Sequence, residues 1–179
     1  MGMSSFGEKG RSIDDVHSLS DYDRHRVLPH EMESITHFQP LLNWWKKVDE
    51  EGQGLPSRAD FNPVAFQSII PNIAILDLIY EQDVVIDCRT ALIGTALAEV
   101  YGEATGKLTT EINNEYVTQT ILEAVRECVR TRQPVGIIAK AATENLPFLR
   151  SFVLYCPLAT DRKNIDKVAI HISFESNSS

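Results

Sequence analysis

Cysteine is scarce and long apolar runs are lacking, and each absence excludes a class of protein. The three cysteines, Cys88, Cys128 and Cys156, are odd in number and far apart, which argues against a disulfide framework and a structural zinc site. No stretch of about 18 apolar residues occurs, so the sequence predicts no membrane-spanning helix. The N-terminus lacks the apolar core of a secretory signal. We therefore expect a cytoplasmic protein with reduced thiols.

Positive charge is also in short supply. The chain has 17 Lys and Arg against 25 Asp and Glu, a net charge of −8, so we expect neither nucleic acid nor a membrane as a partner. Hydrophobic residues make up 43% and charged residues 23%, which is typical of globular proteins. A chain of 179 residues can bury a core without metals or disulfides, and we expect one domain.

The predicted organisation is a short N-terminal part followed by one core domain. Residues 1–30 are polar, charged and aperiodic, which predicts a flexible arm. Residues 31–54 contain a helix and a linker, residues 55–176 form the core domain, and residues 177–179 are a tail.

The N-terminal helix is amphipathic and is predicted between about Met32 and Glu51. Its apolar face consists of Leu41, Trp44, Trp45 and Val48. Such a helix can pack on a partner subunit, so Trp44 and Trp45 are candidate interface residues of a homodimer. We expect one of the two tryptophans to dock on its own sheet.

The core domain is predicted to contain two blocks of antiparallel strands with helices between them. The strands are expected at residues 73–79, 84–93, 135–142, 149–158 and 167–175. The helices are expected at residues 64–68, 96–101 and 115–132. This order favours an α+β fold, a five-stranded antiparallel sheet with helices packed on one face and an N-terminal capping helix.

The segment between the N-terminal helix and the sheet, residues 55–63, carries the most specific motif. The motifs are Leu55-Pro56-x-Arg58-x-Asp60-x-x-Pro63, Ile70-Pro71, Leu76-Asp77, Arg89 ahead of Gly94-Thr95, and Gly102-x-x-x-Thr105-Gly106-Lys107. In this spacing they resemble the PAS domain family of the type found mainly in alphaproteobacteria, long described as a domain of unknown function. The resemblance covers about residues 35–175.

The resemblance implies a stand-alone bacterial PAS protein that takes part in signal transduction. PAS domains bind small ligands or cofactors, or serve as dimerisation modules, and pass their state to a partner. We therefore expect a sensor that binds a small molecule, forms a homodimer and acts on another signalling protein. The fold does not dictate the ligand.

Haem and flavin signatures are absent, so the cofactor is unknown. The predicted helix at residues 115–132 contains no histidine that could hold a haem iron, and the cysteine-containing signature of flavin photosensors is missing. No two of the five histidines have the spacing of a metal-ligand pair. His171 alternates against Ile170 and Ile172, so it is expected on the other face of the sheet, under the first helix or in a dimer contact.

The candidate ligand pocket lies between the inner face of the sheet and the helices. Strand alternation allows two inner sets. We favour the set with Phe152, Leu154, Cys156, Leu158, Ile170 and Ile172 from the strands and Val117, Ile121 and Val125 from the helix. Most of these side chains are expected to fill a core, and Cys128 and Cys156 are expected to be small core residues.

Arg89 is the one charged candidate for ligand binding. It can aim its guanidinium at a ligand carboxylate or at Asp77 across the hairpin. Arg58 and Asp60 form either an exposed recognition surface or, more simply, a local ion pair within a turn.

The glycine-rich positions lack the spacing of a phosphate-binding loop. Thr95 is expected to cap a helix, and Gly102 and Gly106 are expected at left-handed turn positions.

Three hypotheses follow. The first is a PAS-type sensor or adaptor, the second is a purely structural interaction module with no small ligand, and the third is an enzyme that uses Arg89 to clamp a small acid. We expect no enzyme, because no nucleophile or base occurs in a recognisable setting.

Overall fold

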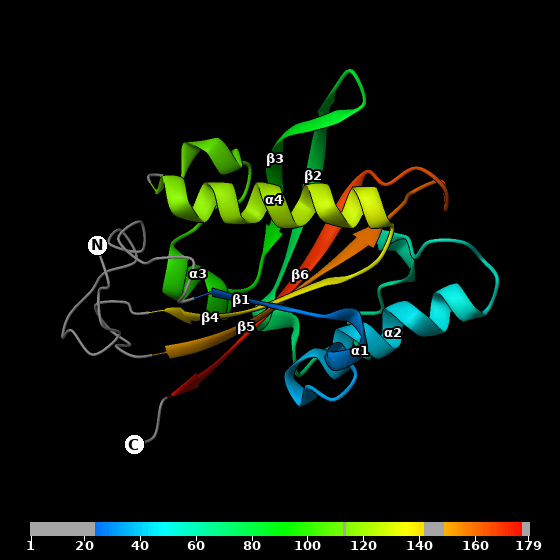
Figure 1. The fold of residues 1–179 in the computed structure, drawn as a ribbon, viewed down its shortest axis with the longest axis horizontal. Coiled ribbons are helices and arrows are strands. Elements are labelled where there is room, and N and C mark those ends of the chain that lie inside the picture. Colours follow the sequence, from blue (N-terminus) through cyan, green and yellow to red (C-terminus); the bar gives the residue numbers. More distant parts are fainter. Residues whose placement is uncertain (1–23, 113, 142–148, 177–179) are drawn as a thin grey trace.

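The protein is built around one antiparallel sheet of six strands in the order β1-β4-β5-β6-β2-β3 (Figure 1). This computed structural model describes residues 24–112, 114–141 and 149–176. The strands are β1 (Arg24–Val27), β2 (Ile73–Glu81), β3 (Val84–Ile93), β4 (Val135–Ala141), β5 (Leu149–Leu158) and β6 (Lys167–Ser176). The α+β fold with an antiparallel sheet is therefore confirmed.

Most helices lie at the predicted places, but the N-terminal helix, expected from about Met32, begins only at Gln39, and one expected helix does not form. The α-helices are α1 (Pro29–Met32), α2 (Gln39–Glu50), α3 (Thr95–Tyr101) and α4 (Glu115–Thr131), and the short 3-10 helices are η3 (Thr36–Phe38), η4 (Arg58–Asp60), η5 (Ile70–Asn72) and η6 (Thr109–Glu111). The helix expected at residues 64–68 is wrong, because this stretch forms consecutive turns. Asn62 accepts a hydrogen bond from the backbone N–H of Val64, as a cap would, but no helix follows.

The sixth strand comes from the part of the chain that was expected to be an arm. Strand β1 pairs antiparallel with β4, from Arg24 opposite Ala139 to Val27 opposite Gly136. The pairing satisfies backbone groups along the edge of β4, which a sequence pattern of only four residues does not reveal. Residues 1–23 and 177–179, for which an arm and a tail were expected, lie outside the described residues.

The β2–β3 hairpin is confirmed, and its turn explains the register. Gln82 and Asp83 have φ values of 48° and 64°, the left-handed geometry of a two-residue type I′ turn. This turn matches the twist of the flanking strands, so Glu81 lies opposite Val84.

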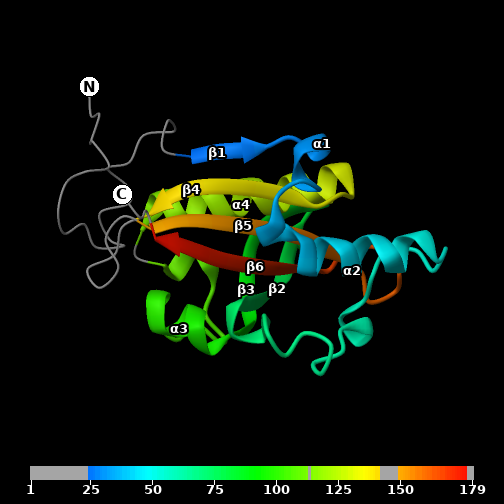
Figure 2. The ribbon, with the colours of Figure 1, turned by 90° about the horizontal axis from the view of Figure 1, so that it is seen from below.

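The two faces of the sheet are covered by different parts of the chain. Figure 2 shows α2 on the near side of the strands and α4 on the far side. Leu97 of α3 and Val125 and Cys128 of α4 pack on one face with Val168 of β6. We call this the α4 face.

The opposite face, which we call the α2 face, is covered by the N-terminal segment, residues 29–50. Leu41 and Trp45 of α2 belong to the same buried cluster as Ile73 and Leu154 of the sheet. A helical part at 31–54 and a core domain at 55–176 were expected. One buried cluster contains residues from both parts, so they pack as one unit.

The helix α4 begins and ends with recognisable caps. Asn114 accepts a hydrogen bond from the backbone N–H of Val117 at 3.1 Å, and Arg132 adopts a left-handed conformation with φ of 56° after the last turn. The side chains buried under the helix are Leu122, Ala124, Val125 and Cys128.

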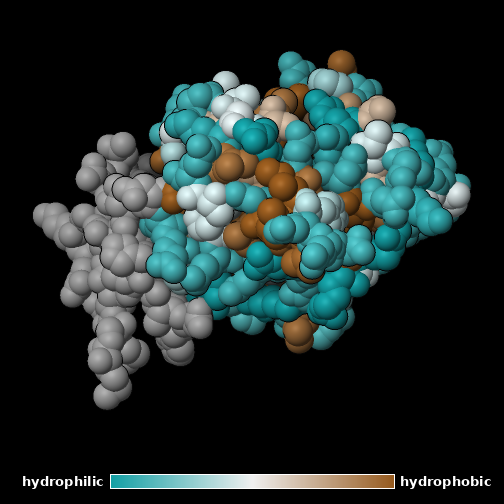
Figure 3. Space-filling view, turned by 90° about the horizontal axis from the view of Figure 1, so that it is seen from above, coloured by the Kyte–Doolittle hydropathy of each residue, from teal (hydrophilic) through white to brown (hydrophobic). Residues whose placement is uncertain are grey.

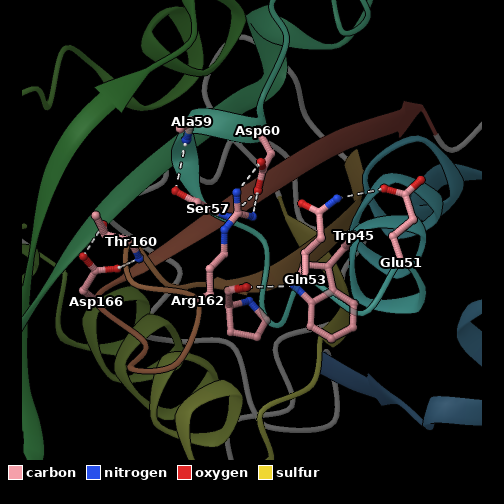
Figure 4. Close-up of polar contacts among 10 residues, drawn as sticks. Trp45, Glu51, Gln53, Ser57, Ala59, Asp60, Thr160, Arg162 and Asp166 are labelled. Carbon is pink, nitrogen blue, oxygen red and sulfur yellow. Dashed lines mark hydrogen bonds and ion pairs between the residues drawn. The ribbon is translucent and has the colours of Figure 1, made fainter.

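The N-terminal helix is attached to the sheet by a buried polar contact. The indole N–H of Trp45 donates to the backbone carbonyl of Pro157 in β5 at 2.8 Å, and the side chain is only 2% exposed (Figure 4). Trp44 lies on the neighbouring side and packs edge-on against Phe61 and Phe66. Trp45 is thus a core residue of its own chain, and Trp44 is the tryptophan that keeps exposed surface.

We call residues 55–63 the connector, since they link α2 to the sheet. Asp60 forms a two-pronged ion pair with Arg162 of the β5–β6 loop, with 2.7 Å between Oδ1 and Nη2 (Figure 4). Asp60 also accepts from the backbone N–H of Ser57 at 2.7 Å, which closes the η4 turn. The Arg162 guanidinium holds the pKa of the Asp60 carboxyl below its usual range.

Backbone hydrogen bonds reinforce the same attachment. The N–H of Leu55 donates to the carbonyl of Arg162 at 3.0 Å, and the N–H of Ala159 donates to the carbonyl of Pro56 at 2.8 Å. The expected local ion pair between Arg58 and Asp60 is wrong. The guanidinium of Arg58 lies 5.4 Å from the ring centre of Phe61 instead. Asp60 pairs with Arg162, which is far away in the sequence.

Replacement of the Asp60 carboxylate should loosen the connector. We expect Asp60→Asn to lower the free energy of unfolding by about 1–2 kcal/mol, because a charge-assisted pair and a turn cap weaken while the side chain keeps its size. Urea denaturation measures the loss. Arg58→Gln, which leaves the Asp60–Arg162 pair intact, is the control, and equal losses in the two variants would contradict the assignment.

The two tryptophans should respond differently to the same substitution. Trp45→Phe removes the hydrogen bond to Pro157 and opens a small buried cavity, so we expect a loss of about 1–3 kcal/mol. Trp44→Phe should cost less, because the Trp44 side chain is only half-buried and packs edge-on against two phenylalanine rings that a phenyl ring can still contact. Thermal unfolding followed by circular dichroism compares the two, and a larger loss for Trp44→Phe would show that the docking residue is misassigned.

Candidate functional site

An open cavity of about 450 Å³ lies on the α2 face, where the N-terminal segment meets β6. We call it the outer groove. It is lined by Thr36, His37 and Pro40 from η3 and α2, by Ser68, Ile69 and Asn72 from the turns before β2, and by His171, Ser173 and Phe174 from β6. Three segments far apart in the sequence therefore meet at one hollow.

His171 is the buried polar group of this groove. It lies opposite Ile73 of β2 and Leu154 of β5, and only 4% of its surface is exposed. Its Nδ1 atom has no hydrogen-bond partner among the described residues. A buried polar atom without a partner costs about 1–3 kcal/mol. The position confirms the expectation that His171 faces the N-terminal helix side of the sheet.

Burial lowers the pKa of His171 to about 4, and the neighbouring His37 ring adds a smaller effect in the same direction. A hydrogen bond with the backbone of His37 acts the other way. The ring is therefore neutral near pH 7.

His37 forms the wall of the groove above β5 and β6. Its Nδ1 lies 2.8 Å from the hydroxyl of Ser173, and its ring stacks on Phe152 with 3.9 Å between the ring centres. Its Nε2 lies 3.8 Å from a carboxylate oxygen of Glu175. The ring is thus held by a stacking contact and by a strand hydroxyl.

Ser173, His37 and Glu175 have the residue types of a hydrolytic triad, but their geometry differs from one. The carboxylate is beyond hydrogen-bond distance from the imidazole. Ser173 lies within a strand, where no helix N-terminus directs backbone N–H groups at a developing oxyanion. Ser173 and His37 form a hydrogen-bonded pair in the wall of the groove, and Glu175 lies beside it.

Asn72 completes the polar lining. Its amide group donates to the carbonyl of Ile172 at 2.9 Å, which fixes the side chain and leaves the amide oxygen as an acceptor. The lining therefore holds hydroxyl, amide and imidazole groups together with apolar carbon, and no Lys, Arg, Asp or Glu is among the described residues that form it.

The predicted ligand-binding residues do not share one face, so the favoured inner set is wrong. Phe152, Leu154 and Cys156 belong to the cluster on the α2 face, whereas Ile170 lies on the α4 face. The reason is the register between β5 and β6, in which Tyr155, not Leu154, is opposite Ile170.

The helix residues of that set are on the α4 face. Val125 is fully buried, Ile121 packs against the same cluster and Val117 is half-buried. Residues of the predicted set do not line the outer groove, although Phe152 supports His37 from below. A ligand-binding role for the set stays a prediction.

The three cysteines are free and buried, as expected for core residues. Burial raises the pKa of the thiols of Cys88 and Cys128 to about 12 and that of Cys156 well above its ordinary value. The thiols therefore stay protonated near pH 7 and are poor nucleophiles.

Arg89 stays on the surface and does not contact Asp77. The two residues are opposite each other in the β2–β3 register, but Arg89 donates to the carbonyl of Gly106 at 2.7 Å and Asp77 pairs with Lys167. The expected cross-strand pair is wrong, because each side chain has a nearer partner. Arg89 ties the loop after α3 to β3.

The remaining motif residues are structural. A Cβ atom at Gly94 would lie 2.3 Å from the carbonyl oxygen of Pro71, so only glycine fits where the chain passes η5. Gly94, rather than Thr95, is the cap residue of α3, which corrects the expected cap. Gly102 and Gly106 have φ values of 88° and 82°, which confirms the predicted left-handed turns.

The two prolines of the connector motif have different surroundings. Pro56 is buried beside the β5–β6 loop, and Pro63 is exposed at the start of the turns.

Two simple patterns, a cluster of metal ligands and a membrane-spanning helix, do not occur in the described ranges. No group of three or more His, Cys, Asp or Glu side chains could hold a metal ion there. Among the described helices, none has the length and apolar character needed to cross a bilayer.

The buried His171 should make stability depend on pH. Below pH 6.5 the unfolded chain takes up a proton on this imidazole, whereas the folded chain does so only near pH 4, so stability falls as the pH drops through this window. The loss approaches about 3 kcal/mol. Urea denaturation at pH 7 and pH 4.5 should show it in the wild type and in His30→Gln, an exposed control. His171→Gln should lose this part of the pH dependence, and an unchanged profile would contradict the burial of the ring.

A family model described as PAS domain matches residues 32–170, which is most of the chain. Among curated proteins, none is significantly similar. The match begins in α1 and ends in β6, so it includes the N-terminal segment, the connector and most of the sheet. PAS domains are generally sensory or interaction modules. The match, the antiparallel sheet and the helices that cover it together show that this chain belongs to the PAS domain family.

Proposed function

We propose that this PAS domain is a signal-transduction sensor that binds a small molecule or a protein partner, acts as a homodimer and passes its state to another signalling protein in the cytoplasm. Three free, buried cysteines support the choice of a reducing compartment. The observation that carries the proposal is the packing of the N-terminal segment on the sheet. This packing brings His37 and Trp45 into contact with β5 and β6.

The packing of the N-terminal segment joins a surface hollow to the helix α2. His37 forms one wall of the outer groove, and Trp45, eight residues further along the same segment, is fastened to Pro157. A ligand that prefers one position of the segment shifts the population of that position by its difference in affinity. The connector then carries the change to the β5–β6 loop through Asp60 and Arg162.

Binding without catalysis is the favoured role. The buried thiols stay protonated, and the Ser173–His37–Glu175 wall lacks the hydrogen bond between carboxylate and imidazole that orients a catalytic base. The proposed clamp on a small acid also loses support, because Arg89 is exposed and engaged with Gly106.

A structural interaction module without a small ligand is the second candidate. It is favoured by the dense packing on the α4 face, where Cys88, Val125, Cys128 and Val168 are each 0% exposed. Side chains at such positions fill the space that a ligand would otherwise occupy.

Self-association is supported by apolar surface. Figure 3 shows apolar side chains at the centre of the face that carries α4 and the β2–β3 hairpin, within a polar surround. On this hairpin Val84 is 55% and Ile86 is 42% exposed, and their strand β3 is an edge of the sheet. An exposed edge strand with apolar side chains favours pairing with another chain.

Thermal-shift measurements against a set of charged and uncharged metabolites test the sensor proposal. A ligand present at 100 times its dissociation constant adds about 2.7 kcal/mol, so we expect a rise in Tm of roughly 5–10 °C for at least one compound. A chain whose Tm responds to no compound would favour the interaction module.

Sedimentation velocity tests the homodimer. We expect twice the mass of one chain at micromolar concentration, and a shift toward one chain in Val84→Lys, which places a charge on the apolar edge. Gln82→Lys adds the same charge in the hairpin turn and should leave the dimer intact. A wild type that sediments as a single chain would contradict the homodimer.

A further inference from the structure

We propose that the outer groove is a binding site for a small uncharged molecule that donates a hydrogen bond to His171. The inference rests on the proposed sensor function and assigns its input to the α2 face of the sheet.

The groove has the size and construction of a ligand site. Its volume of about 450 Å³ falls within the usual range of roughly 300–1,000 Å³ for small-molecule pockets. Its walls come from the N-terminal segment, the turns before β2 and strand β6. A molecule bound there touches the N-terminal segment and the sheet at once.

The lining selects against charge. Hydroxyls from Thr36, Ser68 and Ser173 and the amide of Asn72 offer neutral hydrogen bonds. Pro40, Ile69 and Phe174 offer apolar contact. Among the described lining residues an anion would meet no lysine or arginine, and it would approach the Glu175 carboxylate near His37.

His171 is the residue with an unmet requirement. Only 4% of the residue is exposed, and its Nδ1 has no partner in the described structure. In the neutral ring that carries its proton on Nε2, the unpartnered Nδ1 is an acceptor that needs an O–H or N–H donor, and this is the form to which the molecule binds in our proposal. The groups around the ring are His37, whose Nε2 faces Glu175, and neutral side chains, so a neutral donor fits better than an ion.

The His37–Ser173 contact gives the site a second function. The Ser173 hydroxyl can exchange its bond with His37 for a bond with the bound molecule, since one hydroxyl both donates and accepts. Binding then alters the attachment of η3 to β6. A molecule bound at this site therefore changes how the N-terminal segment is attached to the sheet.

Nitrogen-detected NMR of histidine side chains tests the proposal with defined probes. Uracil, phenol and myo-inositol are titrated into the full-length chain, each beside a methylated partner that lacks the donor, such as 1,3-dimethyluracil or anisole. We expect a saturable shift of the His171 Nδ1 resonance with at least one donor probe. The methylated partner should bind at least tenfold more weakly, and benzoate and tetramethylammonium should not bind. If the side-chain resonances of His171 and His37 shift with none of the three donors, the site is overturned. It is also overturned if benzoate or tetramethylammonium binds more tightly than the donors.

Two variants locate the binding independently of each other. His171→Phe removes the acceptor, and Ser68→Trp closes the groove from an exposed position where folding is not at risk. Each should weaken the probe at least tenfold, whereas His30→Phe, an exposed histidine outside the groove, should not. Wild-type affinity in Ser68→Trp would overturn the site even if His171→Phe failed to fold.

The outcomes separate the site from the sensor function. A probe or metabolite that shifts only resonances of the α4 face, such as those of Val125, would overturn the outer groove as the site and leave a sensor with an inner ligand. A chain that binds no probe and shows no thermal shift with any metabolite would overturn both.

Discussion

The two-pronged ion pair between Asp60 and Arg162 fixes the relation between the N-terminal helix and the sheet. It joins the connector to the loop between the two central strands β5 and β6. The backbone carbonyl of Arg162 also accepts a hydrogen bond from the N–H of Leu55. Arg162 therefore binds the start of the connector through its main chain and Asp60 through its side chain. Because this loop holds the connector, α2 packs along the face of β5.

The packing on the α2 face follows from that constraint. With α2 along β5, the indole of Trp45 reaches the carbonyl of Pro157, and the ring of His37 lies flat on Phe152. His171 is then covered and loses its solvent partners, which leaves a polar group at the floor of a groove. The groove thus depends on how the N-terminal segment packs on the sheet. A shift of the segment changes the shape of the groove, and a molecule in the groove contacts the segment.

The sequence reveals the elements of this fold better than their contacts. The hairpin at Gln82 and Asp83 and the long amphipathic helix follow from local turn and periodicity rules. The partner of Asp60 does not, because Arg162 is about a hundred residues away and carries no local pattern. The inner pocket set failed for a similar reason: alternation shows that Leu154 and Tyr155 face opposite ways, but only the register with β6 shows which of them joins Ile170. His171 was recognisable as a residue that faces away from its apolar neighbours, whereas the groove beside it depends on three distant segments.

The N-terminal segment seals His171 against the sheet, and an NMR titration of the His171 ring in the wild-type chain measures this directly. We expect a pKa of about 4, since burial opposes the charged form. A pKa near the ordinary value of about 6.5 would contradict it, because the ring would then be in water and the segment would not be seated as described.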